Sequence, residues 1–347
     1  MLIIGCDFHS RFQQIALLDT ETGEVVDKRL EHEGGEAKRF YEGLKGPALV
    51  GIETTGYTRW FAEMLAELGH ELVVGEAGKI RAQDPRKQKH DRRDAEHILN
   101  LLVRGDFPRI WLPSASERDV RVLVEHRHQL VELRTRAQNG LQALALSYGL
   151  RRRQRLWSKA GQEELQKLPL REGAGRRRED LLQLVRQLNT WIKELDQRIE
   201  DEVARREDAQ RLLTHPGVGP QTALTTVLVL GPVERFPDAK HVTSYLGLIP
   251  QEDSSAGRQR FGHLTKQGNR LMRFLLVEAA GIASRFDPGL RRMYRRLAFR
   301  KGAAVAKVAV ARKLAIRLYV MLRDRIDYPE FCRRGSHAGM LAEVALA

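Results

Sequence analysis

The chain has 347 residues, with 59 Lys and Arg against 45 Asp and Glu and a formal net charge of +14. This length exceeds one ordinary core, so we expect two or three domains, and the basic surplus indicates a polyanionic partner such as nucleic acid. No apolar run approaches the roughly 20 residues of a membrane-spanning helix, and the first residues lack a secretory signal. The two cysteines, Cys6 and Cys332, form neither a disulfide framework nor a zinc motif. We therefore expect a cytoplasmic protein with no membrane partner.

The first hundred residues alternate strand and helix signals. Short apolar runs predict strands at 2–7, 13–19, 24–33, 48–53 and 70–75, and helices are expected at 36–44, 57–68 and 90–103. A strand meander followed by alternating helices and strands is typical of an α/β layer structure with a mixed sheet. The order of elements is compatible with an RNase H-like fold.

Four acids stand at chemically similar places in this region. Asp7 and Glu53 each close an apolar strand, where an unpaired buried carboxylate is unfavourable. Asp91 and Asp94 lie three positions apart on the following helix, a spacing at which like charges repel. Catalytic groups gather at strand ends in such sheets, and oxygen ligands suit Mg²⁺ or Mn²⁺. The four acids therefore predict a divalent metal site, although each acid taken alone is typical of a solvated surface.

The next region contains no strand signal. Residues 117–148 and 176–212 are predicted to form two long helices, and the second has a coiled-coil-like seam. Its apolar positions step by threes and fours: Leu181, Val185, Leu188, Ile192, Leu195 and Ile199. Such a seam can close an intramolecular helical hairpin or join subunits, and the pattern does not decide between the two.

A third region begins near residue 206. Gly217 and Gly219 separate helical stretches and resemble the hairpin of helix-hairpin-helix DNA-binding modules, where backbone N–H groups meet a phosphate. A plain tight turn explains the same pattern. Helices are predicted from Asn269 onward and at 303–323, and the tail after Tyr328 is expected to be irregular.

Five segments together resemble the DEDD transposases of the insertion-sequence-110 family. They are GCDFHS, GIETTG, KHDRRDAEHI, LTHPGVGPQTA and YLGLIPQEDSSAGRQRFGHLTKQGN, in this order along the chain. The resemblance implies a RuvC-like, RNase H-fold DEDD domain at 1–110, a helical coiled-coil segment at 111–205, a mainly helical C-terminal transposase domain at 206–330 and a tail at 331–347. It places the family's four metal-binding acids on Asp7, Glu53, Asp91 and Asp94.

The resemblance also implies a serine nucleophile after the Gly-Leu-x-Pro stretch. Counting forward from Pro250 selects Ser255, and counting back from Lys266 favours Ser254. The serine is expected to join covalently to a cut DNA strand, with Arg258, Arg260 and Lys266 binding phosphates nearby. Members of the family act as homo-oligomers, dimers or tetramers, on donor and target DNA guided by a bridge RNA, so the resemblance implies these partners and a nucleoid-associated location in a prokaryotic cell.

Two other functions fit parts of the sequence. A RuvC-like endonuclease or junction resolvase would keep the four acids but use water in place of Ser255. A non-enzymatic DNA-binding protein would account for the charge, the helices and the glycine hairpin.

Overall fold

The structure, a computed structural model, describes residues 1–83, 91–151, 156–252 and 261–334. The chain divides into two compact units, Met1–Leu112 and Pro113–Ala347. Each unit has hydrophobic clusters of its own. Among the described helices, none combines the length and the apolar character needed to cross a membrane.

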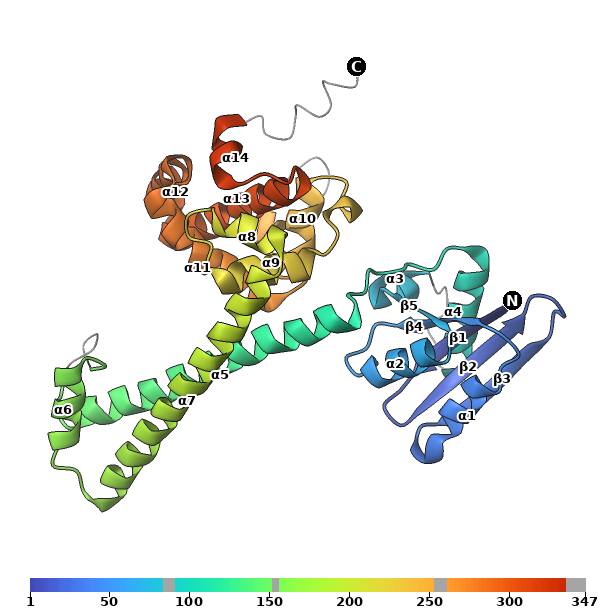
Figure 1. Ribbon diagram of the computed structural model, residues 1–347, viewed down its shortest axis with the longest axis horizontal. Helices are drawn as coiled ribbons and strands as arrows, with labels where there is room; N and C mark the ends of the chain where they lie inside the picture. Colours follow the sequence, from blue (N-terminus) through green and yellow to red (C-terminus); the bar gives the residue numbers. More distant parts are fainter. Residues whose placement is uncertain (84–90, 152–155, 253–260, 335–347) are drawn as a thin grey trace. The chain divides into compact units, whose positions relative to one another are not determined.

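The first unit is built on a five-stranded mixed sheet in the order β3-β2-β1-β4-β5 (Figure 1). The strands are β1 (Leu2–Phe8), β2 (Phe12–Asp19), β3 (Val25–Glu31), β4 (Ala48–Glu53) and β5 (Glu71–Gly75). The first three form an antiparallel meander, β4 runs parallel to β1, and β5 runs parallel to β4. The five strands predicted from apolar runs are thus confirmed.

Helices cover both faces of this sheet. They are α1 (Glu36–Glu42), α2 (Arg59–Glu67), α3 (Ala77–Ala82) and α4 (Asp91–Arg104), with a short 3₁₀ turn, η1 (Glu33–Gly35). Because side chains alternate along a strand, Ile4 and Cys6 of β1 pack with Phe61 of α2 on one face. Ile3 packs with Leu99 of α4 on the other face. The six-residue helix α3 was not predicted.

Two glycines allow α4 to lie directly on the sheet. Gly5 of β1 is paired with Gly51 of β4. A Cβ atom at Gly5 would lie 2.3 Å from both the carbonyl oxygen of Ala95 and the backbone nitrogen of Leu99, and one at Gly51 would lie 2.7 Å from a methyl carbon of Leu102. No side chain larger than that of glycine fits at either position. The two glycines therefore determine the distance of α4 from β1 and β4 and its place on the sheet.

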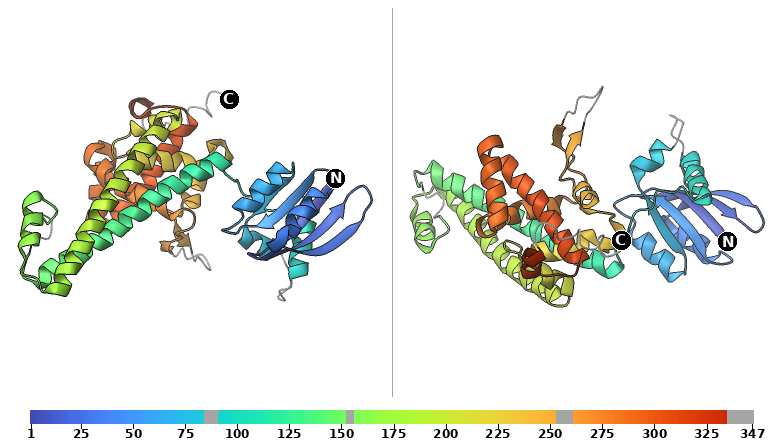
Figure 2. Two further views of the ribbon diagram at one scale, coloured as in Figure 1. Left: turned by 60° about the horizontal axis from the view of Figure 1, so that its bottom comes forward. Right: turned by 90° about the horizontal axis from the view of Figure 1, so that it is seen from above.

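The second unit begins with a long helical hairpin. Helix α5 (Ala115–Ser147) starts at a capping box formed by Ser114 and Glu117, and it packs along α7 (Glu172–Ala204), as both views in Figure 2 show. Leu188 and Ile192 of α7 are buried with Leu130 of α5. Within the described residues the predicted seam therefore closes an intramolecular hairpin.

The boundaries of the second long helix were predicted wrongly. A single helix at 176–212 was expected, but α7 begins at Glu172 and ends at Ala204, and a separate helix, α8 (Glu207–Leu213), follows. The break lets Ala209 and Leu212 of α8 turn into the C-terminal core. A short helix between the long ones, α6 (Lys159–Lys167), was not predicted; its Leu165 is buried against the hairpin.

The rest of the second unit is mainly helical. It contains α9 (Pro220–Leu230), η2 (Val233–Arg235), α10 (Ala239–Tyr245), α11 (Arg270–Phe286), α12 (Pro288–Lys301), α13 (Ala303–Arg323) and α14 (Tyr328–Arg334). Val310, Leu314 and Leu318 place α13 at the centre of the core. The predicted helices at 269 onward and 303–323 are confirmed. The antiparallel strands β6 (Pro250–Glu252) and β7 (Phe261–Leu264) were not predicted. The chain is thus mixed α/β followed by a mostly helical region, as expected.

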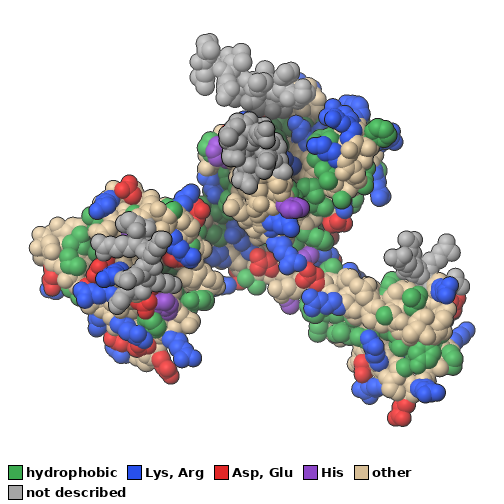
Figure 3. Space-filling model, turned by 180° about the vertical axis from the view of Figure 1, so that it is seen from behind, with side chains coloured by type: hydrophobic (Ala, Val, Ile, Leu, Met, Phe, Trp, Pro, Cys, Tyr) green, Lys and Arg blue, Asp and Glu red, His purple; other side chains and the backbone are tan. Residues whose placement is uncertain are grey.

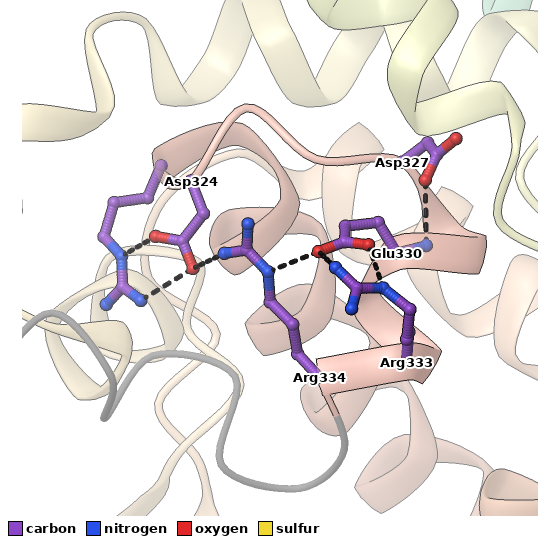
Figure 4. A network of polar contacts seen from close by, with 6 residues as sticks. Asp324, Asp327, Glu330, Arg333 and Arg334 are labelled. Carbon is purple, nitrogen blue, oxygen red and sulfur yellow. Dashed lines mark hydrogen bonds and ion pairs between the residues drawn. The ribbon is translucent and has the colours of Figure 1, made fainter.

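The segment after Tyr328 was expected to be irregular, but it continues as α14 through Arg334. Asp327 accepts a hydrogen bond from the Glu330 backbone nitrogen at 2.9 Å. Glu330 in turn binds Arg333 at 2.7 Å and Arg334 at 2.8 Å, as Figure 4 shows. These local ion pairs stabilise a helix whose apolar pattern is too short to be recognised in the sequence.

Candidate metal centre

The fold of the first unit brings the four predicted acids to one edge of the sheet. Cys6 of β1 is paired with Ile52 of β4, so the next residues, Asp7 and Glu53, follow at the carboxyl ends of neighbouring parallel strands. Strand alternation puts both on the face of Gly5 and Gly51, which α4 covers. Because α4 begins at Asp91, its first turn carries carboxylates to the same edge.

The tightest group at this edge consists of Asp7, His9 and Asp91. The Asp7 Oδ2 atom lies 3.0 Å from His9 Nε2, which lies 3.8 Å from Asp91 Oδ2. One ligand atom from each of the three residues falls within 4.8 Å of the others. The Asp7 side chain is 17% exposed, whereas that of Asp91 is 45% exposed. A group of two carboxylates and an imidazole at this spacing is suited to holding a divalent cation.

The electrostatics of Asp7 favour the arrival of positive charge. Burial is the main cause of the raised pKa of Asp7; His9 acts in the opposite direction, and the negative charges of Asp94 and Asp91 raise the pKa further. The charges of Asp91 and Asp94 therefore add to burial in opposing the ionisation of Asp7. A bound divalent ion would relieve that repulsion.

Glu53 and Asp94 are held differently from Asp7 and Asp91. The Glu53 Oε1 atom accepts a hydrogen bond from Arg81 Nη2 at 2.8 Å. The bond and the charge of Glu53 raise the pKa of Arg81, and the charge of Asp94 adds to the effect. Asp94 thus lies within the electrostatic reach of both Asp7 and Arg81. The structure places Glu53 at the same sheet edge but with an arginine as its cationic partner.

Comparison with known proteins identifies the family. Residues 4–149 match a model of DEDD transposases of the IS110 type, and residues 209–295 match the model described as the transposase IS116/IS110/IS902 family. Together the two matches cover more than half of the chain. The chain belongs to the IS110 family of transposases.

Individual relatives extend the similarity along nearly the whole chain. The transposase is 28% identical over 336 residues to a probable family 20 transposase of Pseudomonas aeruginosa, which covers 94% of this chain and 98% of the relative. It is 25% identical over 325 residues to the putative transposase y4pF/y4sB of Sinorhizobium fredii, covering 90% and 81%. It is also 28% identical over 201 residues to the transposase for insertion sequence element IS1111A of Coxiella burnetii, covering 56% and 55%. The protein is a DNA transposase.

Two residues of the transposase's acidic edge were not identified from the sequence. His9 follows Asp7 by two positions, so an extended chain carries both side chains to the same face; that alternation was the available signal. Arg81 reaches Glu53 from α3, a helix that the sequence did not reveal, so no pattern linked the two. Both residues contact acids that were proposed as metal ligands.

The predicted serine loop lies largely outside the described residues. Ser254, Ser255, Arg258 and Arg260 belong to 253–260, and the structure describes only the base of the hairpin. A Cβ atom at Gly247 would lie 2.3 Å from the Gln267 carbonyl oxygen, and one at Gly268 would lie 2.1 Å from the Tyr245 carbonyl oxygen. The base is therefore a close backbone-to-backbone contact.

Two basic residues complete this base. Arg273 of α11 donates hydrogen bonds to the carbonyl oxygens of Gln267 and Gly268. Lys266 is exposed and adopts a φ of 54°, which is uncommon for a residue other than glycine. Its proposed phosphate contact stays a prediction.

The two glycines of the predicted DNA-binding hairpin differ from each other. Gly217 has a φ of 87°, and a Cβ atom there would lie 2.6 Å from the backbone nitrogen of Ala283 in α11. Its conformation thus serves the packing of the turn against α11. Gly219 is the N-cap of α9 and has open space around it. A tight packed turn accounts for Gly217, and a phosphate contact at either glycine stays a prediction.

Proposed function

We propose that this transposase cuts and rejoins DNA at a site where Asp7, Glu53, Asp91 and Asp94 hold Mg²⁺ or Mn²⁺. The observation that supports this most is the meeting of the Asp7 and Asp91 carboxylates around His9, with ligand atoms within 4.8 Å of one another. The order of the five strands and the covering helix α4 support an RNase H-like, RuvC-like fold for the first unit. A divalent ion there would supply Lewis-acid stabilisation of the phosphate and of the leaving oxygen.

The chain's own residues would position that site. His9 orients the Asp7 carboxylate by the 3.0 Å contact. The packing of α4 on Gly5 sets the height of Asp91 and Asp94 above the strand ends. Arg81 holds Glu53 and competes with a metal ion for that carboxylate. Release of Glu53 from Arg81 would complete the set of four acids.

Ser255 is the proposed nucleophile. Its hydroxyl oxygen would form a bond to the phosphorus of a DNA phosphodiester as the bond from phosphorus to the 3′-oxygen breaks, and its proton would pass to a general base while the 3′-oxygen takes one up. The phosphoserine link conserves the phosphodiester bond energy, so the strands can be rejoined. Arg258, Arg260 and Lys266 would bind the flanking phosphates.

The same proposal includes two further partners, a second copy of the chain and a guide RNA. The serine loop and the acids belong to different units of the chain, so we propose that a homo-oligomer contributes to the complete site. The net charge of +14 supports binding of a guide or bridge RNA in addition to donor and target DNA. Copurification followed by sequencing of the bound nucleic acid tests whether the protein binds a guide RNA. We expect a discrete structured RNA. Recovery of nothing but random host RNA would contradict this part of the proposal.

Covalent capture tests the chemistry. Wild-type protein incubated with end-labelled DNA and Mg²⁺ should give a protein–DNA adduct that survives denaturation. Ser255→Ala should abolish the adduct and Ser254→Ala should keep it, while Asp7→Asn should abolish both cleavage and adduct. Cleavage by Ser255→Ala without any adduct would establish a hydrolytic, RuvC-like nuclease instead. A protein that binds DNA but never cuts it in any divalent metal would be a non-enzymatic DNA-binding protein.

A further inference from the structure

The exposed side of helix α12, in the second unit, carries only positively charged side chains among its ionisable groups. The stretch from Pro288 to Lys301 contains no Asp or Glu. Its cations are all exposed: Arg291, Arg292, Arg295, Arg296, Arg300 and Lys301. Lys and Arg side chains gather at the upper right of Figure 3, which corresponds to the part of Figure 1 where α12 is labelled.

An exposed aromatic side chain lies within this basic face. Phe299 is 94% exposed, more than any other large hydrophobic side chain of the described residues. It follows Arg292 by seven positions, Arg295 by four and Arg296 by three, which are the spacings of one helix face. The opposite face is buried, because Leu290 is 1% exposed and Met293 and Tyr294 pack on the core. Phe299 therefore stands between arginines on the solvent side.

Arginines of this face lack the acidic partners that several arginines elsewhere in the unit have. On α7, Arg176 pairs with Asp180 at 2.9 Å, and on α14, Arg333 pairs with Glu330 at 2.7 Å. Within the described part of the chain, no carboxylate forms an ion pair with Arg292, Arg295 or Arg296. A surface with this much uncompensated charge and an exposed aromatic ring is complementary to a polyanion that also offers apolar contacts.

The helix is held firmly at its beginning. Asp287 caps α12 by accepting a hydrogen bond from the Leu290 backbone nitrogen. The same carboxylate lies 2.6 Å from Arg317 Nη1 of α13 and 2.5 Å from the Tyr328 hydroxyl of α14. The Asp287 and Arg317 side chains are only 5% and 12% exposed. Three helices thus meet at one buried carboxylate, and the basic face is presented on a rigid support.

We propose that the exposed face of α12 binds duplex DNA in the major groove. The groove is about 12 Å wide and accepts an α-helix, and the 14 residues of α12 extend over about 21 Å. The arginines bind phosphates on the two strands that border the groove, and Phe299 faces the base edges, where thymine methyl groups offer apolar contact. The deep, narrow major groove of A-form RNA does not admit a helix, so the surface prefers DNA. This binding requires neither the metal site nor Ser255.

A binding experiment on the full-length protein tests this surface separately from the chemistry. In EDTA, with a labelled 30-base-pair duplex, the triple variant Arg292→Gln, Arg295→Gln, Arg296→Gln is compared with wild type over a range of salt concentrations. We expect at least about tenfold weaker binding and a slope of log Kobs against log salt reduced by about 2 to 3, since each phosphate contact contributes about 0.9. Phe299→Ala should weaken binding a few-fold and leave the slope unchanged.

A matched control removes the same charge from another helix. The variant Arg186→Gln, Lys193→Gln, Arg198→Gln changes three exposed cations of α7 and should keep at least most of the slope. Circular dichroism should show all variants folded, because every replaced side chain is exposed. An unchanged slope in the α12 triple variant would overturn the proposal, as would an equal loss in the α7 control. A loss of equal size with double-stranded RNA would also overturn it and would indicate an RNA-binding surface.

Discussion

Helices α4 and α12 both carry concentrated charge, but the two are built in opposite ways. The first turn of α4 brings two acids against a third that is mostly buried, and the sheet glycines beneath it fix their positions. Helix α12 carries six exposed cations, and it is anchored through its buried side and its N-cap. Helix α4 thus fixes the positions of individual side chains, whereas α12 provides a high density of exposed charge.

This contrast follows from the ligand that each helix is proposed to bind. A small divalent ion is stabilised only by oxygens at ligand distance, so the backbone supporting Asp7 and Asp91 must be rigid. A duplex is a long array of phosphates, so charge density matters more than the position of one side chain. Substitutions at the acidic edge should therefore have large and specific effects, whereas single substitutions on α12 should have small and additive ones.

The largest effect is expected at the centre of the acidic edge. Asp7→Asn keeps the size of the side chain but removes the charge, and DNA cleavage in Mg²⁺ should fall by at least about 100-fold, the loss typical when a charge-stabilising group is removed from a site. Single-turnover cleavage rates measure this. Asp106→Asn, an exposed acid of the same unit, is the control and should cleave at the wild-type rate; equal rates for both variants would mean that Asp7 takes no part.

The next largest effect is expected at Asp287, the buried carboxylate that caps α12, and it should appear in the free energy of unfolding. Asp287→Asn breaks a buried ion pair with Arg317, which typically destabilises a protein by about 3–5 kcal/mol. The exposed pair of Arg176 and Asp180 provides a matched control, because Asp180→Asn should change stability by less than about 1 kcal/mol. Urea unfolding of both variants at pH 7 measures the difference, and similar losses would contradict the buried role of Asp287.

The same carboxylate predicts a dependence on pH. Burial alone would raise the pKa of Asp287, but the hydrogen bonds from Arg317, Tyr328 and the Leu290 backbone nitrogen lower it to about 2, below the ordinary 3.8. Its stabilising contribution is therefore complete above pH 4 and is lost as the pH falls toward 2. The stability difference between wild type and Asp287→Asn should shrink over that range; a difference that stays constant would contradict this assignment.

A substitution that disturbs the close packing of α4 on β1 should have a smaller effect on stability. Gly5→Ala places a methyl group against the backbone of Ala95 and Leu99, so α4 must shift, and overpacking of this kind typically destabilises by about 1–3 kcal/mol. Gly78→Ala on α3 meets open space and is the control. Because the shift also moves Asp91 away from Asp7, Gly5→Ala should need more Mg²⁺ for half-maximal cleavage. Wild-type stability in Gly5→Ala would show that α4 is not in contact with β1.

The smallest effect is expected at Arg81. Arg81→Ala frees Glu53 from an exposed ion pair worth at most about 1 kcal/mol, so the Mg²⁺ concentration for half-maximal cleavage should fall by up to about fivefold. Titration of cleavage against Mg²⁺ measures this, with the exposed Arg104→Ala as the control. A loss of activity as large as that of Asp7→Asn would instead assign Arg81 to DNA binding or catalysis.

The sequence predicted the acidic edge because strand ends and helix starts leave local signals. Asp7 and Glu53 close apolar runs, and Asp91 and Asp94 begin a helix, so their convergence follows from parallel strand order. Arg81 could not be found in this way, since its contact with Glu53 depends on a six-residue helix and on side-chain direction. The strands β6 and β7 have three and four residues, too few for a period-2 pattern. The break between α7 and α8 arises from tertiary packing of Ala209 and Leu212, which no local pattern shows.

Binding of Mn²⁺ measured by electron paramagnetic resonance tests the acidic edge most directly, because it requires no DNA, no RNA and no serine. Wild-type protein should bind Mn²⁺ in a saturable manner, and Asp7→Asn and Asp91→Asn should each lose that binding, while Asp106→Asn retains it. Equal Mn²⁺ binding by wild type and Asp7→Asn would contradict the proposal that these carboxylates hold the metal ion.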